Sequence, residues 1–208
     1  MIPTGEVAEA HRRLYALLDG LDVRAPSPLP GWTRGHVLAH VTDAGRALAD
    51  LVEQALAGNQ VLLYDPATHD RDGIIEATAG RTPEEHQAAL REHSERLEAA
   101  WARVEDWAQP VRYRDGKLSS TVFARWREVW IHAVDLGLPV AEWPEDFCVH
   151  AVDFLRDRLP DGVVIGDDED ADVRGHVRDL AAWLSGRAPG DALTGELPEL
   201  GAWPGARR

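Results

Sequence analysis

Four long segments of the sequence repeat apolar residues at steps of three and four, the spacing of one face of an α-helix. We expect these helices at about residues 4–21, 33–57, 82–107 and 119–137. Each helix needs neighbours to cover its apolar face, and four such helices in series are typical of a four-helix bundle. The sequence therefore predicts a mainly α-helical protein whose first domain, residues 1–143, is a bundle.

Local signals mark where several helices begin. Thr33 precedes one helix, and Thr82 precedes another that has proline at its first position and Glu85 at its third. We also expect Thr4 to cap the first helix. Residues 58–81 read as a loop with at most a short helix near residues 73–80, and a loop of this length is often functional.

The chain changes character after Trp143 and Pro144. We expect a shorter helix at about residues 144–159, short strands near residues 163–165 and Val173, a helix at 175–185 and an irregular tail. Residues 144–208 are therefore predicted to form a small α+β domain, too short for a sizeable core of its own.

Composition excludes several kinds of partner. A formal net charge of −14 argues against nucleic acid and against anionic membranes. The sequence has no apolar run of membrane-spanning length and no secretory signal pattern, so we expect a cytoplasmic protein. The single cysteine, Cys148, excludes an internal disulfide. No helix shows a spare apolar face, which favours a monomer.

Three residues with metal-binding side chains are expected to face the bundle core. Glu128 and His132 are four residues apart and so lie on one side of their helix, and His40 lies on the inward stripe of the second helix. A partly buried carboxylate needs a charge partner, which a divalent metal would supply. A core histidine beside a Glu–His hydrogen bond explains the same spacing, so both interpretations stay open.

Other histidines and one carboxylate offer alternatives. His36 and His40 are also four apart, but no third ligand lies near them in the sequence. His93 faces the apolar side of the third helix, either as a core residue or as a support for a site. Asp135, three residues after His132, either orients a ligand or lies at the surface of the helix end.

Two stretches of the chain resemble the signature segments of the mycothiol-dependent maleylpyruvate isomerases, a branch of the DinB-like metalloenzymes. They are GWTRGHVLAHV (residues 31–41) and REVWIHAVDLG (residues 127–137), and similar segments occur at residues 64–75, 92–101 and 181–187. The resemblance implies a DinB-like four-helix bundle followed by a small α+β domain related to sterol-carrier proteins (SCP2-like). That domain is shortened here, because the stretch between residues 165 and 173 lacks a strand pair.

The resemblance also implies a set of site residues. A zinc ion would be held by His40, Glu128 and His132, the set already singled out by spacing. The loop arginine of the family corresponds to Arg71, a catalytic or substrate-binding residue, and Arg125 is a second candidate partner for an anion. The expected cofactors are Zn²⁺ and mycothiol.

The reaction implied by the resemblance is the cis–trans isomerisation of maleylpyruvate to fumarylpyruvate. The mycothiol thiolate would add to the cis double bond, the resulting single bond would rotate, and elimination would give the trans product. Two alternatives remain: a mycothiol S-transferase acting on another electrophile, and a non-catalytic metal-binding protein on the same scaffold. For the isomerase and for the S-transferase, the expected partner is a small anionic or electrophilic molecule.

Overall fold

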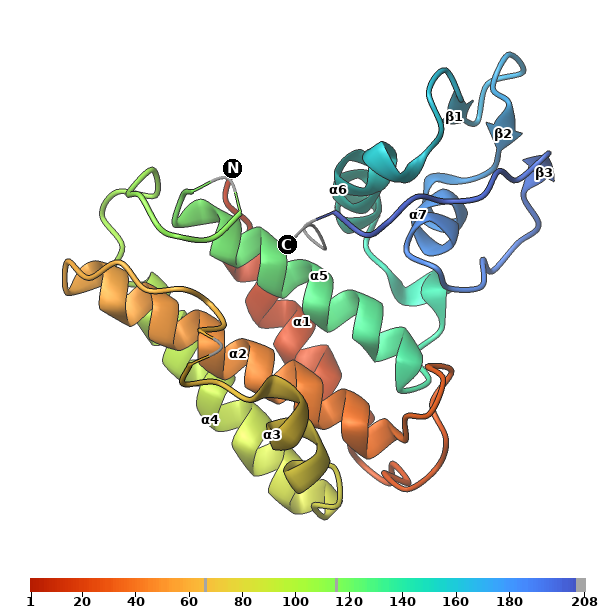
Figure 1. Cartoon of the computed structure of the whole chain (residues 1–208). Helices are drawn as coiled ribbons and strands as arrows, with labels where there is room; N and C mark the ends of the chain where they lie inside the picture. The colour runs from red at the N-terminus through yellow and green to blue at the C-terminus, as the bar shows by residue number, and fades with distance from the viewer. Residues whose placement is uncertain (66, 115, 205–208) are drawn as a thin grey trace. The chain divides into compact units, whose positions relative to one another are not determined.

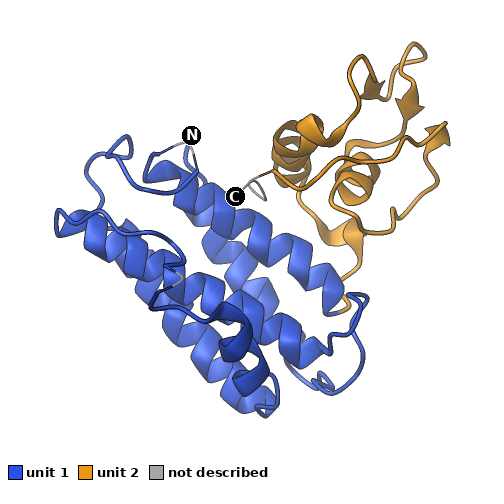
Figure 2. Cartoon of the chain, viewed as in Figure 1, with its two compact units in different colours: residues 1–136 blue, residues 137–208 orange. Residues whose placement is uncertain are grey.

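The structure is a computed structural model that describes residues 1–65, 67–114 and 116–204, and most of it is α-helical (Figure 1). The chain divides into two compact units, Met1–Leu136 and Gly137–Arg208 (Figure 2). The first unit ends before the domain boundary expected after residue 143, because the 3₁₀ turn η1 (Val140–Glu142) packs against a helix of the second unit. The division into domains at residue 143 stays a prediction.

The first unit is built from four long helices that run side by side (Figure 1). They are α1 (Thr4–Leu17), α2 (Arg34–Leu56), α4 (Pro83–Trp101) and α5 (Ser119–Asp135), and the short α3 (Arg71–Thr78) packs on α2. Contacts of α2 with α4 and α5, and of α1 with α4 and α5, enclose an apolar core. The predicted helical bundle is confirmed. Within the described residues, no helix combines the length and apolar character needed to cross a membrane.

Helix starts follow the predicted signals in two cases out of three. The side chains of Thr33 and Thr82 cap α2 and α4, each within a capping box. The expected Thr4 cap is wrong, because α1 begins at Thr4 itself and has no side-chain cap. The first helix also ends at Leu17 rather than near residue 21, since Gly20 adopts a positive φ of 73° that breaks the helix.

The end of α4 and the segment that follows it differ from expectation. The helix stops at Trp101 rather than near residue 107, and Asp106 then stabilises a turn by accepting a hydrogen bond from the backbone N–H of Ala108. Pro110 and Lys117 form an isolated antiparallel bridge, in agreement with the turn or short hairpin expected there.

The second unit combines two helices with a small sheet. Helix α6 (Glu145–Leu155) continues into the turn η2 (Arg156–Arg158) and packs against α7 (Val177–Leu184). Strand β1 (Ile165–Gly166) pairs in parallel with β2 (Val173–Arg174), which pairs antiparallel with β3 (Thr194–Gly195). The predicted small α+β unit is confirmed, and the tail is not wholly irregular because it supplies β3.

Candidate metal centre and active site

Two neighbouring helices bring the three predicted ligands together. His40 lies on α2, Glu128 and His132 lie on α5, and one potential ligand atom from each residue falls within 4.8 Å of the others. Glu128 Oε2 is 3.0 Å from His40 Nε2 and 3.5 Å from His132 Nε2. Among the residues that the structure describes, this is the one group of three or more such side chains with this geometry.

Asp135 contacts the ring nitrogen of His132 that faces away from Glu128. Its Oδ2 lies 2.8 Å from Nδ1 of His132, and the side chain is buried rather than at the surface. A carboxylate that accepts the Nδ1 proton leaves Nε2 of the ring free to bind a metal, and it makes that nitrogen more basic. Of the two interpretations of Asp135, the structure favours the one in which it orients a ligand.

Electrostatics keep Glu128 ionised. Burial on its own would raise the pKa of Glu128, but its contact with His40, and then His132 and Arg125, hold that pKa below its usual range. The result is a carboxylate between two imidazole nitrogens. Two imidazoles and one carboxylate are a common donor set for catalytic zinc, which keeps a further position open for a non-protein ligand.

Arg71 reaches the cluster from the loop side. It is the first residue of α3, and its Nη2 donates to Nδ1 of His40 at 3.0 Å. Because a guanidinium can only donate, this ring nitrogen is the acceptor and the proton of the neutral His40 ring lies on Nε2, toward Glu128. The Arg71 side chain is 37% exposed, so part of it remains open to a small molecule.

The structure places Arg125 elsewhere. Its side chain is 0% exposed and donates to His11 Nε2 at 2.9 Å, to the carbonyl of Val41 at 2.6 Å and to Ser94 Oγ at 3.1 Å. Burial lowers the pKa of Arg125 to about 10. The guanidinium therefore joins α5 to α1, α2 and α4 within the core, and it offers no surface to a substrate.

The competing histidine pair does not form. His36 is turned back to the start of α2, where its Nδ1 lies 2.7 Å from Thr33 Oγ1 and accepts from the Thr33 backbone N–H. Its Nε2 is 3.6 Å from a carboxylate oxygen of Glu76. His36 therefore completes a capping box instead of joining His40.

Further residues near the cluster were not singled out from the sequence. The Trp32 ring centroid lies 5.8 Å from that of His40, and Tyr64 stacks on His69 at 5.0 Å. Burial raises the pKa of Tyr64, and the charges of Glu128 and Asp43 raise it further, so its hydroxyl stays a neutral donor. Asp43, three residues after His40, could have been found from its helical spacing.

Comparison with known proteins identifies the family and the fold of the chain. The family model described as the mycothiol maleylpyruvate isomerase N-terminal domain matches residues 5–137. Two similar crystal structures each share 27% sequence identity and a TM-score of 0.80, covering 97% of this chain and 97% of theirs. One is a mycothiol-dependent maleylpyruvate isomerase, and the other is such an enzyme with a histidine replaced by alanine. No curated protein sequence matches the chain significantly.

Proposed function

Because the chain belongs to the mycothiol maleylpyruvate isomerase family, we propose that it converts maleylpyruvate to fumarylpyruvate with zinc and mycothiol as cofactors. The observation that carries this proposal is the convergence of His40, Glu128 and His132 beside the partly exposed Arg71. All four residues lie inside the segment matched by the family model. The structural similarity extends over nearly the whole chain.

The donor set fits zinc. His40 and His132 would bind through Nε2, and Glu128 through Oε2, since these atoms face one another. Zinc, when bound, would hold the sulfur of mycothiol as a thiolate at neutral pH. Asp135 contributes by keeping the proton of His132 on Nδ1.

Arg71 is the proposed substrate-binding residue. Maleylpyruvate carries two carboxylates, and a guanidinium can hold a carboxylate through two parallel hydrogen bonds. With Nε2 of His40 serving as a metal ligand, its ring proton belongs on Nδ1, which can then no longer accept from Arg71. Arg71 would thus be released toward the substrate. There it would stabilise the negative charge that develops on the substrate during thiolate addition.

The decisive experiment combines the purified chain, mycothiol and maleylpyruvate and follows the appearance of fumarylpyruvate. We expect turnover that requires mycothiol and zinc. Consumption of mycothiol by a different electrophile without isomerisation would identify an S-transferase. Bound zinc with neither reaction would identify a non-catalytic metal-binding protein.

The metal site is tested separately by measuring zinc content. His40→Ala should lose zinc and activity together, whereas His36→Ala, one turn earlier on the same helix, should keep its zinc. Unchanged zinc in His40→Ala would refute the proposed ligand set.

A further inference from the structure

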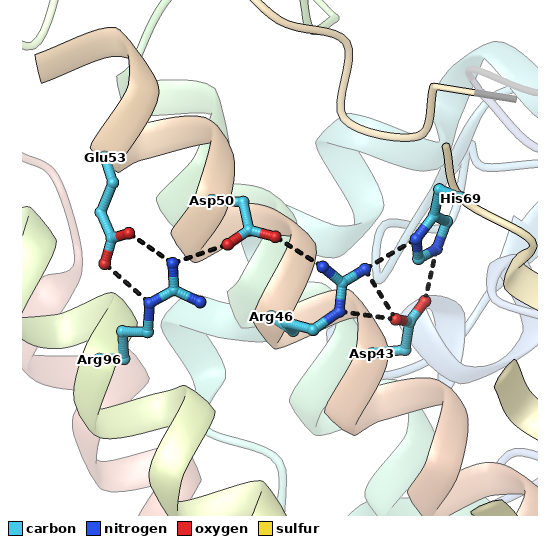
Figure 3. A network of polar contacts seen from close by, with 6 residues as sticks. All are labelled: Asp43, Arg46, Asp50, Glu53, His69 and Arg96. Carbon is cyan, nitrogen blue, oxygen red and sulfur yellow. Dashed lines mark hydrogen bonds and ion pairs between the residues drawn. The ribbon is translucent and has the colours of Figure 1, made fainter. Parts of the chain in front are cut away.

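A chain of polar contacts runs along α2 and joins it both to α4 and to the loop that precedes α3 (Figure 3). At one end, Arg96 of α4 donates to Glu53 at 2.8 Å and to Asp50 at 2.7 Å. Asp50 in turn accepts from Arg46 at 2.6 Å. The members of this network are Asp43, Arg46, Asp50, Glu53, His69 and Arg96.

At the other end of the network both ring nitrogens of His69 have partners. Nε2 lies 2.9 Å from Asp43 Oδ2, and Arg46 donates to Nδ1 at 2.7 Å. Since Arg46 can only donate, His69 is neutral with its proton on Nε2, and it donates that proton to Asp43. Arg46 also contacts Asp43 Oδ1 at 3.1 Å and 3.2 Å. The Asp43 carboxylate is buried and the His69 side chain is 9% exposed, so the three groups form a tightly held set.

This set lies next to the proposed metal centre. Asp43 follows His40 by three residues on α2, and His69 precedes Arg71 by two residues in the chain. His40 accepts from Arg71 while Asp43 accepts from His69, so two neighbouring side chains of α2 hold two neighbouring side chains of the loop. Zinc binding would release the first contact and leave the second, so the contact of His69 with Asp43 is the one that holds the loop in the zinc-loaded protein. Tyr64, from the same loop, stacks on the His69 ring. The loop is therefore attached to the bundle at the point where its functional side chains emerge.

We propose that His69 and Asp43 are positioning residues, which fix Tyr64 and Arg71 beside the metal cluster and so set the affinity for the anionic substrate. Neither residue belongs to the cluster of His40, Glu128 and His132. Arg46, which is held by Asp50, prevents the His69 ring from turning. The substrate part of this inference rests on the proposed function, whereas the ordering of the loop does not.

Two substitutions of His69 separate hydrogen bonding from bulk. In His69→Gln the carboxamide carries a donor and an acceptor separated by one carbon, as the imidazole does, so it can serve both Asp43 and Arg46. His69→Met has comparable reach without these groups. Asp43→Asn removes the charge from the other partner at constant size. His176→Met makes the same replacement at an exposed histidine of the second unit and is the matched control.

The first measurement is hydrogen exchange of the zinc-loaded protein over residues 59–80. We expect exchange about tenfold faster than wild type in His69→Met and Asp43→Asn, and close to wild type in His69→Gln and His176→Met. Zinc content should stay at the wild-type level in all four variants, because the proposed ligands His40, Glu128 and His132 are unchanged in each of them. Unchanged exchange in His69→Met, loss of zinc from it, or a Gln variant that behaves like the Met variant would overturn the proposal.

The second measurement separates KM from kcat for maleylpyruvate. In His69→Met we expect KM to rise about tenfold with a smaller fall in kcat, and we expect His69→Gln to restore KM. A fall in kcat at constant KM would contradict a role in substrate affinity. If the wild-type protein shows no isomerisation, the proposed function fails, and the exchange rates still decide whether His69 and Asp43 position the loop.

Discussion

A buried histidine in the bundle core makes stability depend on pH. His11 is 1% exposed, and its Nδ1 lies 2.5 Å from Glu98 Oε1 while its Nε2 accepts from Arg125. Burial lowers the pKa of His11 to about 4; the hydrogen bond with Glu98 opposes this effect, and the charge of Arg125 adds to it. The ring is therefore neutral in the folded protein over a range where an exposed histidine is protonated.

The sign and the size of the effect follow from linkage. Between pH 6.5 and about 4 the unfolded chain binds a proton at this position and the folded chain does not. The stability contributed by the neutral ring is complete above pH 6.5 and falls progressively as the pH approaches 4. The difference between the two pKa values corresponds to about 3 kcal/mol of unfolding free energy.

Urea unfolding of the metal-free protein at a series of pH values tests this expectation. The comparison is with His11→Gln, whose carboxamide can still donate to Glu98 and accept from Arg125 but does not titrate. Other ionisable groups affect both proteins alike, so the difference in unfolding free energy isolates His11. We expect wild type to lose about 3 kcal/mol relative to the variant between pH 7 and pH 4. A difference that stays constant over this range would refute the reasoning.

Two further predictions concern the groups that support the core and the cluster. Asp135→Asn should weaken zinc binding by about 10- to 100-fold, as measured by competition with a chromogenic chelator, because His132 loses its carboxylate partner; unchanged affinity would contradict that role. Gly45→Ala should lower the unfolding free energy by about 1–3 kcal/mol, since the new Cβ would lie 3.1 Å from the guanidinium of Arg125. Helix propensity alone would make Gly45→Ala more stable by about 1 kcal/mol, so a variant at least as stable as wild type would argue against crowding at Arg125.

The bundle was predictable because its signals are local. Apolar spacing within one segment identifies a helix, and the side chains of Thr33 and Thr82 cap helices only a few residues away. The third strand could not be found in this way. Thr194–Gly195 forms a strand only through its pairing with β2, where a Cβ on Gly195 would lie 2.0 Å from the backbone oxygen of Asp172. That pairing depends on residues distant in the chain.

In the candidate site, too, local sequence patterns predict some residues and miss a contact between distant segments. His40, Glu128 and His132 were predictable from spacing and from the family resemblance, and that resemblance is confirmed. The contact between His69 and Asp43 was not, because nothing local to a loop shows where it meets a helix. The zinc ligand roles and the role of Arg71 stay predictions.

The helical spacing that identified His132 also applies to Arg125. This arginine follows Val122 by three residues and precedes Val129 by four, the same relation that places His132 on the inward face of α5. The spacing therefore indicates that Arg125 also points inward, which favours core packing over contact with an anion. The structure bears out the direction, since the side chain is fully buried.

Two charged side chains of helix α5, Arg125 and Glu128, have charges that are compensated in different ways. Arg125 is itself the cation, and its guanidinium donates to a ring nitrogen of His11, the carbonyl of Val41 and the hydroxyl of Ser94. Around Glu128 the chain supplies electron pairs instead: one carboxylate faces Nε2 atoms of two imidazoles, and Asp135 and Arg71 occupy the outer nitrogens. In each imidazole the proton can move from Nε2, which faces Glu128, to Nδ1 on the outer side. Both Nε2 atoms and Oε2 of Glu128 can then act as acceptors. A metal cation satisfies such a set of acceptors. A second buried arginine would be too large for this place, since Nε2 of His40 and Oε2 of Glu128 are only 3.0 Å apart.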